Sequence, residues 1–127
     1  MAVNRRRDIS PDAFEQLVQQ AIADLPPPYA KLMEAIAVMV EEEPPEEVLR
    51  DLDLDRGDDL LGLYQGQSLA SDSFFRTGGE SPPRISIYRG PILRLCESPE
   101  EVVREVRDTV VHELGHHVGL DDDDMPY

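Results

Sequence analysis

The chain has 127 residues and a formal net charge of -15, because Asp and Glu outnumber Lys and Arg by 27 to 12. This charge repels phosphate backbones and anionic lipids, and no apolar run reaches the length of a bilayer, so we expect neither nucleic acid nor a membrane as partner. The length supports one core, which predicts a single domain over residues 1–127, a monomer by default, with residues 1–9 as a flexible tail. Without a secretory signal, and with a single cysteine that cannot form an internal disulfide, the protein is expected in the cytoplasm.

The first half of the chain predicts helices that alternate with short strands. Ser10 caps a helix in which apolar residues recur at helical spacing as far as Leu25, where prolines 26–28 end it. A short helical turn is expected around residues 29–35, before a buried strand at residues 36–40. Residues 41–59 are rich in Glu, Asp and Pro, which predicts a loop with one short helix, and residues 60–64 then form a second strand.

The second half predicts one more strand and one long helix. Gly, Ser and Pro dominate residues 65–83, which favours a surface loop. Residues 84–89 alternate polar with apolar, the pattern of a strand with one covered and one open face, and Gly90 and Pro91 predict a break after it. Ser98 with Pro99 and Glu101 then begins a helix that should run to about Val118.

Two histidines frame the sequence His-Glu-Leu-Gly-His at residues 112–116, near the end of that helix. Positions four apart lie on one helix face, so the imidazoles of His112 and His116 can converge on one cation. Glu113 projects about a quarter-turn away, which suits a general base that contacts water without displacing it from the metal. The spacing therefore predicts a zinc site with a hydrolytic base beside it.

A catalytic zinc site usually has three protein ligands and an open fourth position. In the extended form of this motif, a glycine follows the second histidine by three residues and the third ligand comes three residues later. Those positions hold Gly119 and Asp122 here, and a carboxylate oxygen is an accepted zinc ligand. Asp121 and Asp123 are alternatives, and iron, manganese or cobalt suit the same set of ligands.

Three segments resemble the zincin metallopeptidases, and among them the small bacterial peptidases called minimal zincins. The segments are residues 112–122 (HELGHHVGLDD), 61–66 (LGLYQG) and 87–92 (IYRGPI). The resemblance implies an α+β, zincin-like fold in which a small mixed twisted sheet packs with helices, one of them a central zinc-binding helix. It also implies an edge strand that aligns an extended peptide, which we expect at residues 84–89.

The predicted activity is zinc-dependent hydrolysis of peptide bonds, with one Zn²⁺ held by His112, His116 and Asp122 and with Glu113 as general base. The substrate would be a peptide or a protein. One alternative is a catalytically silent metal-binding module, for interaction or regulation, on the same scaffold. A second is an acidic adaptor that binds a basic partner and uses no metal.

Other polar residues near the motif have less specific interpretations. His117 is expected to pack in the core, and Cys96 to be a buried thiol and not a ligand. Glu105 and Asp108 either orient a ligand histidine or are simply solvated. An oxyanion donor is expected among three residues: Tyr88, Arg89 and Tyr127.

Overall fold

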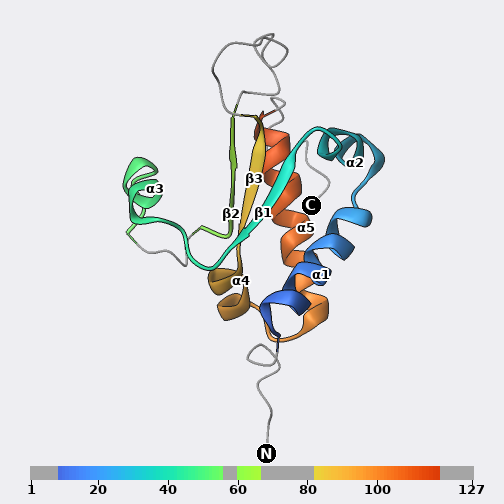
Figure 1. Ribbon diagram of the computed structural model, residues 1–127, viewed down its shortest axis with the longest axis horizontal. Helices are drawn as coiled ribbons and strands as arrows, with labels where there is room; N and C mark the ends of the chain where they lie inside the picture. Colours follow the sequence, from blue (N-terminus) through green and yellow to red (C-terminus); the bar gives the residue numbers. More distant parts are fainter. Residues whose placement is uncertain (1–8, 56–59, 67–81, 118–127) are drawn as a thin grey trace, which may run out of the picture.

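The computed structural model describes residues 9–55, 60–66 and 82–117, with the last two histidines described only by their backbone. The fold is α+β, with a small mixed sheet and helices packed on it (Figure 1). Its elements follow in the order α1 (Pro11–Ala23), α2 (Pro27–Met33), β1 (Ala37–Glu41), α3 (Glu46–Asp51), β2 (Gly62–Gln65), β3 (Arg84–Tyr88), α4 (Arg89–Leu95) and α5 (Pro99–His117).

The two longest described helices begin at the capping residues that the sequence predicts. The Ser10 hydroxyl accepts a hydrogen bond from the Ala13 N–H at 3.1 Å, and Ser98 accepts one from the Glu101 N–H at 3.2 Å. The Glu101 carboxylate also accepts the Glu97 N–H at 2.9 Å. These bonds satisfy N–H groups that have no partner within the helix, so both helix starts are fixed locally by a few residues.

The sheet has the strand order β1-β3-β2, with β1 parallel and β2 antiparallel to β3. The placement of residues 84–89 at the edge is therefore wrong, because β3 lies in the centre and β2 forms one edge of the described sheet. The prediction of an open face on this strand is also wrong. Ser86 is only 1% exposed, so the alternation reflects a small polar residue within a strand that is buried on both faces.

The strand ends just before Gly90 and Pro91, as predicted, but these two residues lie in a helix that the sequence did not predict. Both lie in the first turn of α4, where proline is tolerated because its missing N–H would have no helical partner. The Gly90 N–H donates to the Glu42 carbonyl at 2.8 Å, and a Cβ at Gly90 would collide with the Glu43 carboxylate. This close approach brings α4 against the end of β1.

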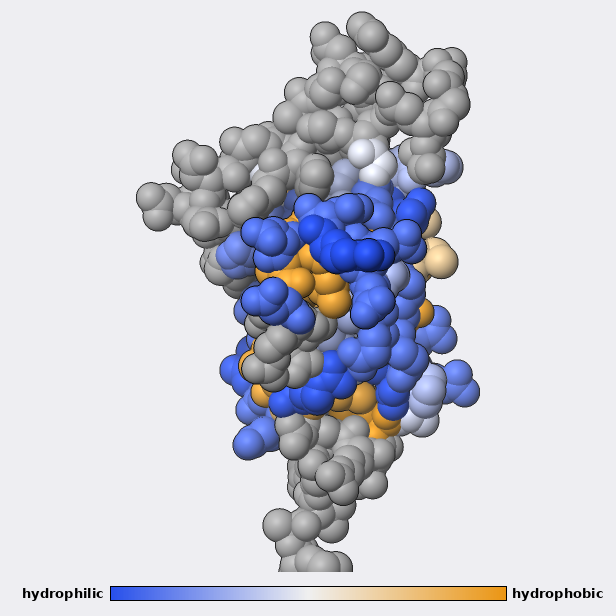
Figure 2. Space-filling view, turned by 90° about the vertical axis from the view of Figure 1, so that its left-hand side faces the viewer, coloured by the Kyte–Doolittle hydropathy of each residue, from blue (hydrophilic) through white to orange (hydrophobic). Residues whose placement is uncertain are grey.

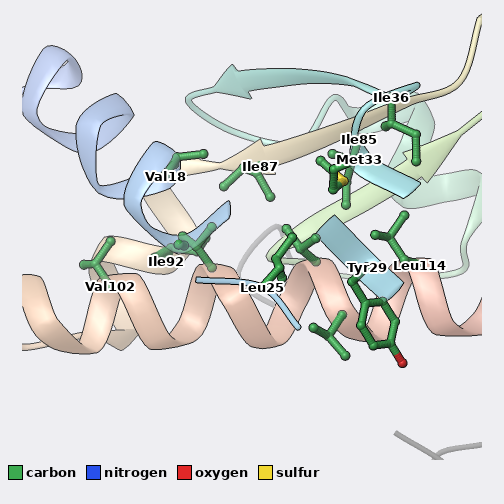
Figure 3. Close-up of a cluster of buried hydrophobic side chains, with 14 of the residues drawn as sticks. Val18, Leu25, Tyr29, Met33, Ile36, Ile85, Ile87, Ile92, Val102 and Leu114 are labelled. Carbon is green, nitrogen blue, oxygen red and sulfur yellow. The ribbon is translucent and has the colours of Figure 1, made fainter. Parts of the chain in front are cut away.

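The core lies between the sheet and the pair formed by α1 and α5. In Figure 3, Ile85 and Ile87 of β3 and Val18 of α1 point into the same interior as Val102 and Leu114 of α5. All five side chains are at most 1% exposed. The helix α5, which carries the two histidines of residues 112–116, is thus packed on two sides, by the sheet and by α1.

The described chain begins with a buried residue. Ile9 is 6% exposed, and its carbonyl accepts a hydrogen bond from the Arg89 guanidinium at 2.7 Å. Arg89 also pairs with Glu42 at 2.7 Å. Ile9 is therefore part of the packed structure and not of the predicted tail, whose other residues lie outside the described part of the chain.

Figure 2 shows a mainly hydrophilic face with smaller apolar areas between the polar residues. The large hydrophobic side chains that stay exposed among the described residues are Met39, Leu52 and Leu95. In the described part of the chain, none of the helices has both the length and the apolar character needed to cross a bilayer.

Candidate metal centre

The first histidine of the motif is held by its own helix. The Nδ1 atom of His112, a half-buried residue of α5, lies 2.9 Å from the Asp108 carbonyl oxygen one turn earlier. A carbonyl only accepts hydrogen bonds, so we assign a proton to Nδ1, which leaves Nε2 as the ring atom that can bind a metal. Imidazoles that bind metals are commonly fixed in this manner by a backbone carbonyl or a carboxylate. His112 therefore has the tautomer and the support that a metal ligand needs.

The glutamate of the motif is held by the neighbouring strand. The Tyr64 N–H of β2 donates to Glu113 Oε1 at 2.9 Å, across 49 residues of sequence. The bond is partly buried, and one of its partners is a carboxylate, which makes it stronger than a neutral pair. Glu113 is consequently fixed between α5 and the edge of the sheet.

A cleft of about 380 Å³ lies between β2 and α5. His112 and Glu113 form part of one wall, and the strand and the preceding loop form the other. Its described lining comprises Leu60, Leu61, Gly62, Glu105, Asp108, Thr109, His112 and Glu113. The cleft brings the two motif residues together with main-chain atoms of an edge strand, an arrangement in which an extended peptide could be bound and attacked.

Burial and like charges act on the titratable groups around this cleft. Burial raises the pKa of Glu105, and the Asp108 carboxylate raises it further. Two tyrosines that are not among the described residues lining the cleft also have raised pKa values. Burial raises the pKa of Tyr64, and burial and the Glu41 carboxylate raise the pKa of Tyr88. The raised pKa of Glu105 thus reflects mainly its partial burial at the cleft, with repulsion from the neighbouring Asp108 carboxylate in addition.

Glu105 and Asp108, for which the sequence leaves open support of a ligand histidine or simple solvation, have different positions in the structure. Asp108 supports His112, but through its backbone carbonyl and not through its carboxylate, which lies 3.4 Å from the Arg107 guanidinium. Glu105 lines the cleft two turns before His112. Cys96 is buried, as predicted.

The predicted oxyanion donors gain no support from the described residues. Arg89 is bound to Glu42 and to the Ile9 carbonyl, and Tyr88 is 1% exposed. Neither occurs among the described residues that line the cleft. Tyr127 lies outside the described part of the chain.

Several predicted ligands also fall outside the described residues. These are Asp122 with its alternatives Asp121 and Asp123, and the side chain of His116. The side chain of His117, which is expected in the core, also lies outside the described residues. Within residues 9–55, 60–66 and 82–117, no three His, Cys, Asp or Glu side chains group as a metal site. Because only His112 of the three predicted ligands has a described side chain, the complete set of ligands stays a prediction.

Sequence reasoning missed the residues on the strand side of the cleft. Gly62 and Tyr64 belong to residues 61–66, a segment that resembles the family but suggests no chemical role by itself. Their contacts with α5 join residues that lie far apart in the chain, so the sequence does not reveal them. The glycine in an otherwise apolar strand was the one available signal, since glycine within a strand often marks a close backbone approach.

A small mixed sheet packed on a helix with the His-Glu-x-x-His motif is the arrangement of a zincin-like fold. The family model for zincin-like metallopeptidases matches residues 33–127, which is most of the chain. The protein therefore belongs to the zincin-like metallopeptidase family. No curated protein matches the chain.

Proposed function

We propose that the protein is a zinc-dependent peptidase that hydrolyses peptide bonds in peptide or protein substrates. The observation that carries this proposal is the cleft in which His112, with its lone pair on Nε2, lies beside the carboxylate of Glu113. Membership of the family supports a metallopeptidase. We also propose that the protein is a monomer and that it is located in the cytoplasm. Sedimentation of the purified protein would test the first statement, and fractionation of cells the second.

We assign the metal to His112, His116 and Asp122, which would hold one zinc ion. The tautomer of His112 fits this role, because its Nε2 can donate a lone pair to a cation. When bound, zinc supplies Lewis acidity, which makes water more acidic and polarises a carbonyl group.

Glu113 acts as the general base. Its Oε1 is fixed by the Tyr64 N–H, and we assign the proton of the attacking water to Oε2. The same carboxyl group would then return this proton to the nitrogen of the leaving amine. The strand side of the cleft, which includes Leu61 and Gly62, would position the peptide so that its carbonyl faces the motif.

The metal assignment is tested by elemental analysis of the protein purified with zinc. We expect about one zinc per wild-type chain and its loss in His112→Ala and Asp122→Ala. Asp108→Ala is the matched control on the same helix, because the group that holds His112 is the main-chain carbonyl, which this variant keeps. Zinc retained by His112→Ala, or absent from the wild type, would contradict the assignment.

The catalytic assignment is tested by peptide cleavage. Zinc-loaded wild type should cut unstructured peptides, and Glu113→Gln should lose at least about 100-fold in kcat while it keeps its zinc. Glu100→Gln, an exposed change on the same helix, should retain full activity. A wild type that binds zinc but cuts no member of a peptide library would favour the silent metal-binding module instead.

A further inference from the structure

Strand β2 approaches α5 unusually closely at Gly62. A Cβ at this position would lie 2.7 Å from Thr109 Cγ2 and 2.9 Å from the Ser86 carbonyl oxygen, both well inside van der Waals contact. The strand can therefore lie at this distance from the helix only because residue 62 has no side chain. Two residues later, the Tyr64 N–H reaches the carboxylate of Glu113 on that helix.

The direction of the Tyr64 N–H follows from the antiparallel pairing of β2 and β3. The Tyr88 N–H donates to the Leu61 carbonyl at 2.9 Å, just before β2 begins. The residues of β2 whose main-chain groups bond to β3 are therefore Leu63 and Gln65, which follow Leu61 at intervals of two. Gly62 and Tyr64, which alternate with them, direct their main-chain groups away from β3. The N–H that holds Glu113 thus belongs to the outer edge of the sheet that the described residues form.

We infer that the main chain of β2 positions the general base: the Tyr64 N–H fixes Glu113 in the cleft, and Gly62 allows the strand to come close enough to do so. This inference rests on the proposed function. Glu113 is the catalytic residue, whereas Gly62 and Tyr64 are positioning residues that act through it. A carboxylate on a helix can adopt several rotamers, and a charge-assisted hydrogen bond of 2.9 Å selects one of them.

The Tyr64 N–H could instead bind the main chain of a substrate peptide, and the two roles predict different kinetic effects. A peptide that adds to the outer edge of β2 would pair with main-chain groups of Gly62 and Tyr64. If the Tyr64 N–H served the substrate, its removal would weaken substrate binding. If it serves Glu113, its removal lowers the rate of the chemical step and leaves binding unchanged.

The experiment replaces the Tyr64 amide by an ester, through incorporation of the α-hydroxy analogue of tyrosine at position 64 of the full-length chain. This change deletes the N–H donor and keeps the side chain. We expect kcat to fall about 10- to 100-fold, with KM and zinc content within about twofold of the wild type. A raised KM with unchanged kcat, or no change in either, would overturn the inference.

The matched control is the same ester at Leu63, whose N–H faces β3. It removes a hydrogen bond of the sheet, so it should lower the melting temperature while kcat stays near that of the wild type. Equal losses of kcat in both esters would show that the strand matters only for folding, which would also overturn the inference.

A second readout separates this inference from the proposed function. Hydrogen exchange of the Tyr64 amide should be slow in the wild type and at least about tenfold faster in Glu113→Ala, because the acceptor is gone. An unchanged exchange rate would show that the contact is absent and would refute the inference, even with an active wild type. If exchange accelerates but the wild type cuts no peptide, the contact stands while the proposed function and the positioning role both fall.

Discussion

At the residue scale, His112 shows how much of a metal site a helix can provide by itself. The group that fixes its ring is the carbonyl four residues earlier, which is present at that position whatever the side chain. From the sequence, the Asp108 carboxylate was one of two candidate supports for a ligand histidine, with simple solvation as the alternative, and the backbone carbonyl was not considered. The contact could not be read from residue types, although the spacing that produces it could.

Glu105 provides a pH-dependent prediction at the same scale. Burial and the Asp108 and Glu101 carboxylates raise the pKa of Glu105, against the lowering effects of Arg104 and His112. The folded state therefore holds this proton more tightly than the unfolded chain does. The resulting stabilisation is fully present below the ordinary pKa of about 4.3 and is lost as the pH rises through the raised value.

Glu105→Gln should consequently raise the free energy of unfolding at pH 7, by about 0.5 kcal/mol or less because the group is partly solvated. The gain should vanish near pH 4. Urea unfolding of metal-free protein at both pH values measures it. Glu100→Gln is the control, since it lies in the first turn, where a negative charge is favourable, and should be neutral or slightly destabilising. A destabilised Glu105→Gln at pH 7 would contradict the argument.

At the element scale, the sequence predicted helices best where their ends carry local signals. Ser10 and Ser98 cap α1 and α5 by hydrogen bonds to residues three positions later. A few neighbouring residues therefore determine where each helix begins. The helix α4 was missed because Gly90 and Pro91 usually interrupt structure, and only the contact with Glu42 and Glu43 explains why the glycine is needed there. Strand order likewise depends on distant partners, which pattern alone does not reveal.

The approach of β2 to α5 yields the prediction for this scale. Gly62→Ala should destabilise the protein by about 1–3 kcal/mol, because the new methyl group meets a main-chain oxygen and the Thr109 side chain. Urea unfolding measures this loss. Combining it with Thr109→Ser, which removes the nearer methyl group, should recover part of the loss but not all, since the Ser86 carbonyl stays at 2.9 Å. Stability equal to wild type in Gly62→Ala would show that the two elements are not in tight contact.

At the scale of the whole molecule, the site depends on a segment outside the family match. The match begins at residue 33, whereas α1 covers Pro11–Ala23 and packs along α5 (Figure 1). Phe14, Val18 and Ala21 of α1 are at most 1% exposed. The sequence predicted this amphipathic helix from its spacing, but not which element it covers. Its apolar face supports the helix that carries His112 and Glu113, so a change in α1 should affect the site through the stability of the fold.

Phe14→Ala tests this dependence. The ring is fully buried, so its removal should lower the free energy of unfolding by about 3–5 kcal/mol in urea unfolding. Gln19→Ala, on the exposed side of the same helix, should change it by less than about 0.5 kcal/mol. Because Phe14 is not among the described residues that line the cleft, Phe14→Ala should keep the zinc content and the kcat of the wild type wherever it remains folded. A loss of kcat at temperatures where circular dichroism shows a folded chain would mean that α1 acts on the site directly, and a loss of stability below about 1 kcal/mol would mean that α5 does not depend on it.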